Sequence, residues 1–153
     1  METPEGIFIE KTLKLGDKFE TEAWGFDLLN RLPLDPGIIK VIRPLDVNRF
    51  RQSFRFNDVR GRSVEAILDD GRIPKKVKDR VTSAYVLAMR HLTEKMIEAR
   101  QPPTLTLETN RDLPNVTIHV DEELIFSVRP SQVIVTFIDG KPDEFFLTIV
   151  DPY

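Results

Sequence analysis

Residues 40–80 contain more than half of the basic side chains of the chain. They hold 12 basic and 6 acidic residues, whereas residues 1–39 hold 4 and 8 and residues 81–153 hold 6 and 11. Most of these cations are arginines, whose planar guanidinium donates paired hydrogen bonds that suit phosphate oxygens and base edges. Clustered charge of this kind predicts contact with nucleic acid. The candidate contact residues are Arg43, Arg49, Arg51, Arg55, Arg60, Arg62, Arg72, Lys75, Lys76, Lys78 and Arg80.

Aromatic residues alternate with arginines in part of this segment. Residues 49–56 read Arg-Phe-Arg-Gln-Ser-Phe-Arg-Phe. In an extended strand successive side chains point to opposite faces, so we expect one basic face and one face formed by Phe50, Phe54 and Phe56. Exposed rings would stack on unpaired bases, which favours RNA or single-stranded DNA over duplex. Another interpretation stays open, in which the cations neutralise the acidic flanks and the phenylalanines pack in the core.

A second group of polar residues surrounds a histidine in the C-terminal half. Histidine has an ordinary pKa of about 6.5, so it can both accept and donate a proton near neutral pH. If the chain cleaves RNA, we expect metal-independent transesterification, with His119 as acid or base and Arg129 stabilising the developing charge. Whether the chain is an enzyme stays open, because the interpretation of His119 as a solvated strand residue is favoured over a catalytic role. The residues expected on one face of the sheet with His119 are Thr117, Ser127 and Thr136.

Several classes of chemistry are excluded by composition. The chain has no cysteine and only two histidines, His91 and His119. Disulfides, iron–sulfur clusters, thiolate metal sites and cysteine nucleophiles are therefore ruled out. The sequence also lacks a glycine-rich phosphate loop, a nucleophile elbow and a zincin helix. We expect no metal and no cofactor.

The acidic segments favour a different kind of function. The sequence pI is about 5.5, which is low for a protein that must hold a polyanion. Residues 121–123 and 139–144 could instead meet a basic protein partner, with electrostatics setting the rate of encounter. The alternative hypothesis is thus a non-enzymatic interaction module, such as an inhibitor, an immunity protein or an adaptor. A homo-oligomer could also form if residues 145–150 are an uncovered edge strand.

Helices that would position these residues are predicted from apolar spacing. Apolar residues recur at helical intervals over residues 74–100, and Pro74 suits the first turn of a helix. Asp17 and Ser63 are candidate N-caps for helices over residues 18–30 and 64–70. Strands are expected in the N-terminal half at residues 7–15, 38–43 and 49–56.

The C-terminal half predicts an antiparallel β-meander packed on the long helix. Loops at residues 121–123 and 129–132 set a register in which Val128 pairs with both Val116 and Val133. The expected strands are residues 104–108, 116–120, 124–128, 132–138 and 145–150. The expected core face contains Val116, Ile118, Val120, Leu124, Phe126, Val128, Val133, Val135 and Phe137. The fold class is therefore α+β.

Length and composition are those of one globular domain. The chain has 153 residues, of which 41% are hydrophobic and 31% charged. We expect a single domain over residues 1–153. No window approaches the length of apolar sequence that spans a membrane, and the N-terminus lacks the pattern of a signal peptide. The default expectation is a cytoplasmic protein with no membrane association.

Overall fold

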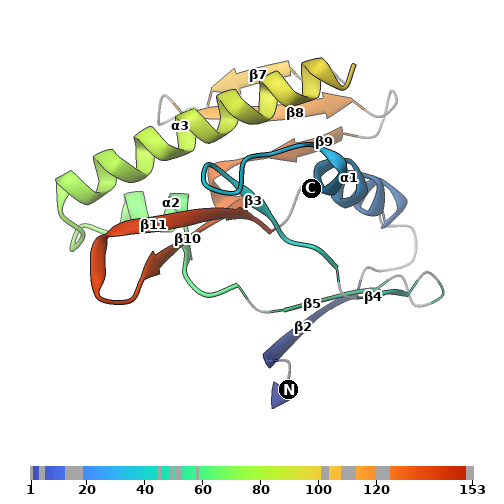
Figure 1. Cartoon of the computed structure of the whole chain (residues 1–153), viewed down its shortest axis with the longest axis horizontal. Helices are drawn as coiled ribbons and strands as arrows, with labels where there is room; N and C mark the ends of the chain where they lie inside the picture. The colour runs from blue at the N-terminus through green and yellow to red at the C-terminus, as the bar shows by residue number, and fades with distance from the viewer. Residues whose placement is uncertain are drawn as a thin grey trace.

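The computed structural model describes residues 2–3, 6–12, 19–44, 46–48, 50, 53–57, 59–100, 104–107, 113–119 and 125–150. Within this part of the chain, helices and mostly antiparallel sheets form an α+β fold, as the sequence predicted (Figure 1). The helices are α1 (Phe19–Arg31), α2 (Val64–Asp69) and α3 (Lys75–Glu98), together with the short 3₁₀ helix η1 (Pro130–Gln132). The sheets have the strand orders β1-β2-β5-β4, β3-β11-β10-β6 and β7-β8-β9.

The long helix α3 lies along the upper side of the molecule in Figure 1 and buries the predicted stripe. Val81, Tyr85 and Leu92 on this stripe are completely buried. Tyr85 also donates a hydrogen bond of 2.6 Å from its hydroxyl to the carbonyl oxygen of Pro114 on β8. The predictions for α2 and its cap are confirmed, because the Ser63 hydroxyl accepts a 3.0 Å hydrogen bond from the Ala66 amide. Helix α1 also lies where it was predicted, although Asp17 is outside the described residues.

The C-terminal strands form two sheets, and the single meander predicted from the sequence is wrong. Strands β7 (Thr104–Leu107), β8 (Pro114–His119) and β9 (Ile125–Val128) pair in the expected order, with Val116 opposite Val128. Strand β10 (Val133–Ile138), however, pairs with β11 (Lys141–Ile149) and β6 (Arg62–Ser63) instead of β9. Val133 therefore lies opposite Ile149 and not opposite Val128.

The turn between β9 and β10 explains this correction. Residues 129–132 were expected to form a hairpin loop, but residues 130–132 form the 3₁₀ helix η1 and Arg129 is its N-cap. The Gln132 amide donates to the Arg129 carbonyl at 2.9 Å, and the Gln132 side-chain oxygen accepts from the Arg129 amide at 3.0 Å. Because these bonds satisfy the backbone within the turn, the chain leaves the β9 ladder and begins a new sheet.

The last strand is a partly covered edge. Strand β3 (Lys40–Val41) pairs with it in parallel, placing Lys40 opposite Thr148. Among the described residues, no strand pairs with the earlier part of β11 on the side away from β10. The condition given for a homo-oligomer, an uncovered edge over residues 145–150, is therefore met only in part. Lysine and proline at the start of β11, Lys141 and Pro142, are residue types that disfavour edge-to-edge association.

The main core joins α3 to both C-terminal sheets. Of the predicted core residues, Val116, Val128, Val133 and Val135 are completely buried, and Phe137 packs against them. Each fully buried aliphatic or aromatic side chain contributes about 1.5–3 kcal/mol to folding, so this cluster is the largest stabilising contact in the fold. The side chains of Ile118, Val120, Leu124 and Phe126 are outside the described residues.

The N-terminal sheet packs on α1 through a separate aromatic cluster. It contains β1 (Glu2–Thr3), β2 (Gly6–Thr12), β4 (Asp46–Asn48) and β5 (Ser53–Asn57). Phe54 and Phe56 on β5 are buried against Phe26 of α1, with ring centroids 5.3 Å from the Phe26 centroid in both cases. The prediction of one strand over residues 49–56 is wrong, because Phe50 lies in the turn of the β4–β5 hairpin.

Candidate nucleic-acid interface

The described part of the basic segment does not form one continuous surface. Arg55 lies on β5 of the N-terminal sheet and Arg43 lies in the connection from β3 to β4, whereas residues 60–80 belong to β6, α2 and the start of α3. Figure 1 places the β4–β5 hairpin at the lower right and the start of α3 at the left. Arg49 and Arg51 are outside the described residues. Any nucleic acid would therefore meet two separate groups of cations.

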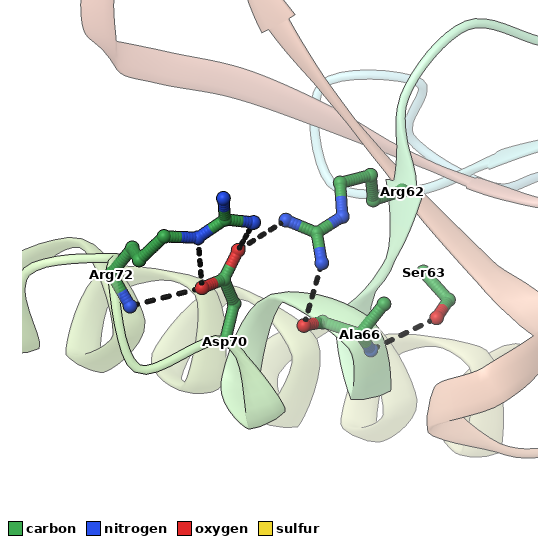
Figure 2. A network of polar contacts seen from close by, with 5 residues as sticks. All are labelled: Arg62, Ser63, Ala66, Asp70 and Arg72. Atoms are coloured by element: carbon green, nitrogen blue, oxygen red, sulfur yellow. Dashed lines mark hydrogen bonds and ion pairs between the residues drawn. The ribbon is translucent and has the colours of Figure 1, made fainter.

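Asp70 holds two of the predicted contact residues in an ion-pair network (Figure 2). Its Oδ2 accepts from Arg62 Nη1 at 2.8 Å and from Arg72 Nη2 at 3.2 Å. Its Oδ1 accepts from Arg72 Nε at 3.1 Å and from the Arg72 amide at 2.9 Å. Arg62 also donates to the Ala66 carbonyl at 3.2 Å, which ties β6 to α2. Both arginines thus have a structural role in fixing the α2–α3 connection.

The network favours the charged forms of Asp70 and Arg72. Hydrogen bonds from the Arg72 and Arg62 side chains hold the pKa of the Asp70 carboxyl well below its usual range. The same contact raises the pKa of Arg72. The Asp70 side chain is only 10% exposed, whereas that of Arg72 is 90% exposed. Figure 2 shows one terminal nitrogen of the Arg72 guanidinium pointing away from Asp70, so Arg72 keeps a donor that faces solvent.

Exposed cations gather around a shallow hollow at the start of α3. The hollow has a volume of about 550 Å³ and is lined by Lys75, Lys76, Asp79, Arg80 and Ser83. Lys75 pairs with Asp79 at 3.2 Å, but both side chains are largely exposed, and such surface pairs contribute little. Lys76 is exposed and has no ion-pair partner in the part of the chain that the structure describes. The first turn of α3 carries no acidic residue and no side-chain cap.

The sequence located the charge of this site but missed the acidic residue that organises it. No role was predicted for Asp70, which is the acceptor that joins Arg62 to Arg72. The available signal was Asp70 at the end of a predicted helix with an arginine two residues later. Ser83, which lines the hollow, carries no signal that separates it from any other exposed helical serine.

The residues predicted for catalysis are brought together only in part. Thr117 lies opposite Ser127 in the β8–β9 ladder, and His119 lies opposite Ile125. Arg129 donates from Nε to the Ser127 hydroxyl at 3.2 Å. Ser127 is only 6% exposed, so its hydroxyl is not on an open surface. The side chain of His119 is outside the described residues, so its proposed chemistry stays a prediction.

Thr136 belongs to a different place from the one that the meander predicted. It lies on β10, which is not paired with β9, and its hydroxyl donates to the Arg60 carbonyl. Thr136, Arg60 and Arg62 all line a second hollow of about 520 Å³ beside Gly61. Asp139 and Phe146 also line this hollow, which therefore combines charges of both signs with apolar side chains.

Neither metal binding nor membrane insertion is indicated by the described residues. Their histidine, aspartate and glutamate side chains form no group of three that could hold a metal ion. None of the described helices is both long and apolar enough to cross a membrane. In comparisons with family models, curated proteins and solved structures, none matches the chain.

Proposed function

We propose that this protein binds nucleic acid, RNA or single-stranded DNA, through the exposed cations at the start of α3. The observation that carries the proposal is the convergence of Lys75, Lys76 and Arg80 on one shallow hollow. Lys76 and Arg80 are four residues apart, a spacing that places both on one face of a helix, so their charges can act on one stretch of backbone phosphates. Arg72, just before the helix, adds a largely exposed guanidinium that is paired with Asp70.

The physical chemistry of the helix start supports an anionic ligand. The N-terminus of a helix carries a partial positive charge, so lysines in the first turn are unfavourable there. Lys75 and Lys76 occupy this position and the first turn holds no acidic residue, although Asp79 one turn later pairs with Lys75. A bound phosphate would make this arrangement of charges favourable, because it interacts with the lysines, with the unpaired amides and with the helix dipole.

The net charge of −3 limits how tightly the protein should bind. Attraction is confined to a local patch, and acidic surfaces elsewhere repel the remainder of a long polyanion. We therefore expect sequence-independent affinity, with a dissociation constant of about 10⁻⁴ to 10⁻⁶ M at physiological salt. Each phosphate contact on a single strand should contribute about 0.7 to the slope of log K against log salt concentration.

Fluorescence anisotropy with labelled single-stranded RNA and DNA at about 50 and 200 mM salt tests this proposal. The variant Lys76→Ala/Arg80→Ala should bind more weakly and should lower the salt slope by about 1.4. The matched control, Arg31→Ala/Arg90→Ala, removes the same charge from exposed positions on α1 and the middle of α3. It should leave the slope close to that of the wild type. Anisotropy that stays flat at both salt concentrations would refute the proposal.

A gel run on the same samples tests the enzymatic version of this function. Intact oligonucleotides after prolonged incubation would make the protein a binder without nuclease activity. Cleavage that His119→Ala abolishes, and that a chelator leaves unchanged, would support metal-independent transesterification. Cleavage that survives His119→Ala would exclude His119 from that chemistry.

Protein interaction remains the second candidate, and the β10–β11 hairpin favours it. The part of β11 before Thr148 has no strand partner on its outer side among the described residues. Exposed Asp139 and Glu144 lie near the end of this hairpin. An open edge with acidic ends could add a strand from a basic partner or from a second copy. This candidate predicts flat anisotropy and, for self-association, a dimer mass in light scattering.

A further inference from the structure

The outer face of α3 carries two exposed apolar side chains. Leu87 and Ile97 are 50% and 57% exposed, whereas the residues of the buried stripe are almost fully covered. Figure 1 shows this helix on the outside of the molecule. One exposed apolar residue is ordinary on a protein surface, but two on the same side of one helix form a candidate contact surface.

Two charged residues lie between these apolar residues on the same side of the helix. We call the four together the outer stripe, which consists of Leu87, Arg90, Glu94 and Ile97. Successive members are three, four and three positions apart, an interval that aligns side chains along one face of a helix. Arg90 and Glu94 are both exposed. The ion pairs within α3 involve other residues, so among the described residues neither charge of the outer stripe has an ion-pair partner.

A shallow hollow between α3 and β8 adjoins the outer stripe. It has a volume of about 260 Å³ and is lined by Val86, Met89, Arg90, Thr93, Glu94 and Pro114. The Thr93 hydroxyl already donates a 2.8 Å hydrogen bond to the Met89 carbonyl, so it needs no further partner. An apolar side chain of a partner can therefore pack against Val86, Met89 and Pro114 and bury more surface than on a flat contact.

We propose that the outer stripe binds the outer stripe of a second copy of this chain, with the two α3 helices antiparallel. In a two-fold dimer, if one residue of the first copy faces a given residue of the second, the reverse contact also forms. Leu92 is the sequence midpoint of two such pairs, Arg90 with Glu94 and Leu87 with Ile97. One two-fold axis at the level of Leu92 therefore forms two ion pairs flanked by two apolar contacts, each next to a hollow.

The order of the charges selects both the direction of the helices and the kind of partner. In a parallel pair Arg90 would face Arg90 and Glu94 would face Glu94, and facing like charges oppose association. In the antiparallel pair the facing charges are opposite in sign. A stripe that reads apolar, basic, acidic, apolar is complementary to itself when reversed, so a second copy of the chain satisfies all four positions.

The shared stretch is short, so we expect a weak dimer. Residues 86–98 of the two copies would overlap along about 18 Å of helix. Such a contact is smaller than a standard protein interface, which favours a dissociation constant of about 10–100 μM. The start of α3 lies beyond this stretch, and Lys76 of one copy would be about 48 Å from Lys76 of the other. A short oligonucleotide would therefore meet one phosphate site in the monomer and in the dimer alike, and dimerisation does not depend on the proposed function.

Sedimentation velocity over about 5 to 500 μM protein, without nucleic acid, tests the dimer. The mass should rise with concentration from the 17.7 kDa of one chain toward twice that value. Leu87→Lys should weaken association about tenfold or more, because the two-fold axis makes one substitution remove two apolar contacts. Ile138→Lys is the matched control, since it replaces an apolar residue that is 39% exposed on β10 and should leave association unchanged. Circular dichroism of each variant checks that the helices remain folded.

Exchange of the two charges tests the antiparallel pairing directly. Arg90→Glu and Glu94→Arg should each weaken association, because like charges would then face each other in two places. An equal mixture of the two variants should recover association, because the altered charges of one variant face opposite charges in the other. Repulsion within each helix is the same before and after mixing. Recovery on mixing therefore reports contact between copies.

Other outcomes would overturn the inference. A monomer at every concentration refutes it. A dimer that persists in Leu87→Lys uses another surface, which is the β10–β11 hairpin if Ile138→Lys dissociates it. A dimer that requires Leu87 but does not recover when the charge variants are mixed lacks the antiparallel pairing. Because these measurements contain no oligonucleotide, their failure leaves the proposed function standing, and flat anisotropy would leave the dimer standing.

Discussion

Gly61 lies directly against the carbonyl oxygen of Val135. A Cβ atom placed on Gly61 would be 2.1 Å from that oxygen, and the backbone of Gly61 has a φ of 130°, which side chains of L-residues rarely allow. This glycine is where the chain reaches β6 from the N-terminal sheet and where pairing of β6 with β10 begins. The close approach therefore positions Arg60 and Arg62 on either side of Gly61 at the second hollow.

The substitution Gly61→Ala should destabilise the protein by about 3 kcal/mol or more, because backbone strain and a clash with a backbone oxygen act together. Urea denaturation followed by circular dichroism measures this loss. Gly71→Ala is the matched control, since a Cβ at Gly71 meets nothing within 4 Å and its backbone is not left-handed. The control should change the free energy of unfolding by no more than about 1 kcal/mol. Equal effects of the two substitutions would contradict the geometry at Gly61.

The network around Asp70 predicts a specific dependence of stability on pH. The Arg72 and Arg62 side chains lower the pKa of Asp70 in the folded protein, whereas in the unfolded chain it should have the ordinary value of about 3.9. As pH falls through that value, the unfolded state takes up a proton that the folded state does not. The stability contributed by Asp70 is therefore fully present near neutral pH and decreases as the pH falls below about 4.

Asp70→Asn should lower the melting temperature at pH of about 7 and flatten the decline in stability between about pH 4 and 2. Thermal denaturation across this range measures both effects. Asp79→Asn is a suitable control, because its partner Lys75 is largely exposed and the pair should contribute little. A variant at Asp70 that keeps the acid dependence of the wild type would show that other carboxylates cause it.

Local patterns in the sequence were sufficient for the helices and for one pair of strands. The stripe on α3 predicts its buried face, because apolar residues at every third or fourth position lie on one side of a helix and face the core. The Ser63 cap predicts the start of α2. The pairing of Val116 with Val128 also follows from local information, since a short loop and a buried face fix the register.

The partners of β10 and β11 could not be predicted in the same way. The parallel pairing of Lys40 with Thr148 joins residues more than one hundred positions apart, and no local signal identifies it. At the β9–β10 connection, a hairpin loop and the 3₁₀ turn begun by Pro130 fit the same four residues. That ambiguity placed Thr136 beside Ser127 in the predicted site, whereas it bonds to Arg60 in the structure.

The basic site illustrates a related limit. The sequence shows which of residues 40–80 are charged, but it does not show which of the basic residues have carboxylate partners. Asp70 engages Arg62 and Arg72, and the N-terminal sheet carries Arg55 away from α3. The alternation of arginine and phenylalanine was informative about residue type, yet it could not distinguish buried Phe54 from exposed Phe50. Only the position of the hairpin turn makes that distinction.

The end of α3 offers a substitution that should stabilise the protein. Arg100 adopts a φ of 60°, in the left-handed region, while its amide donates to the Ile97 carbonyl at 3.0 Å. This conformation closes many helices, and glycine adopts it without the steric cost that a side chain incurs. Arg100→Gly should therefore raise the free energy of unfolding by about 0.5–1 kcal/mol, after allowing for the greater freedom of glycine in the unfolded chain.

The control for this prediction is Arg100→Ala, which removes the same charge but retains the steric cost of a Cβ atom. If backbone strain is the cause, urea denaturation should place Arg100→Gly above both the wild type and Arg100→Ala. If loss of the charge is the cause, the two variants should be shifted equally. Because Arg100 lies at the opposite end of α3 from Lys76, neither variant should alter the salt slope of oligonucleotide binding. A change in that slope would extend the proposed interface along the whole helix.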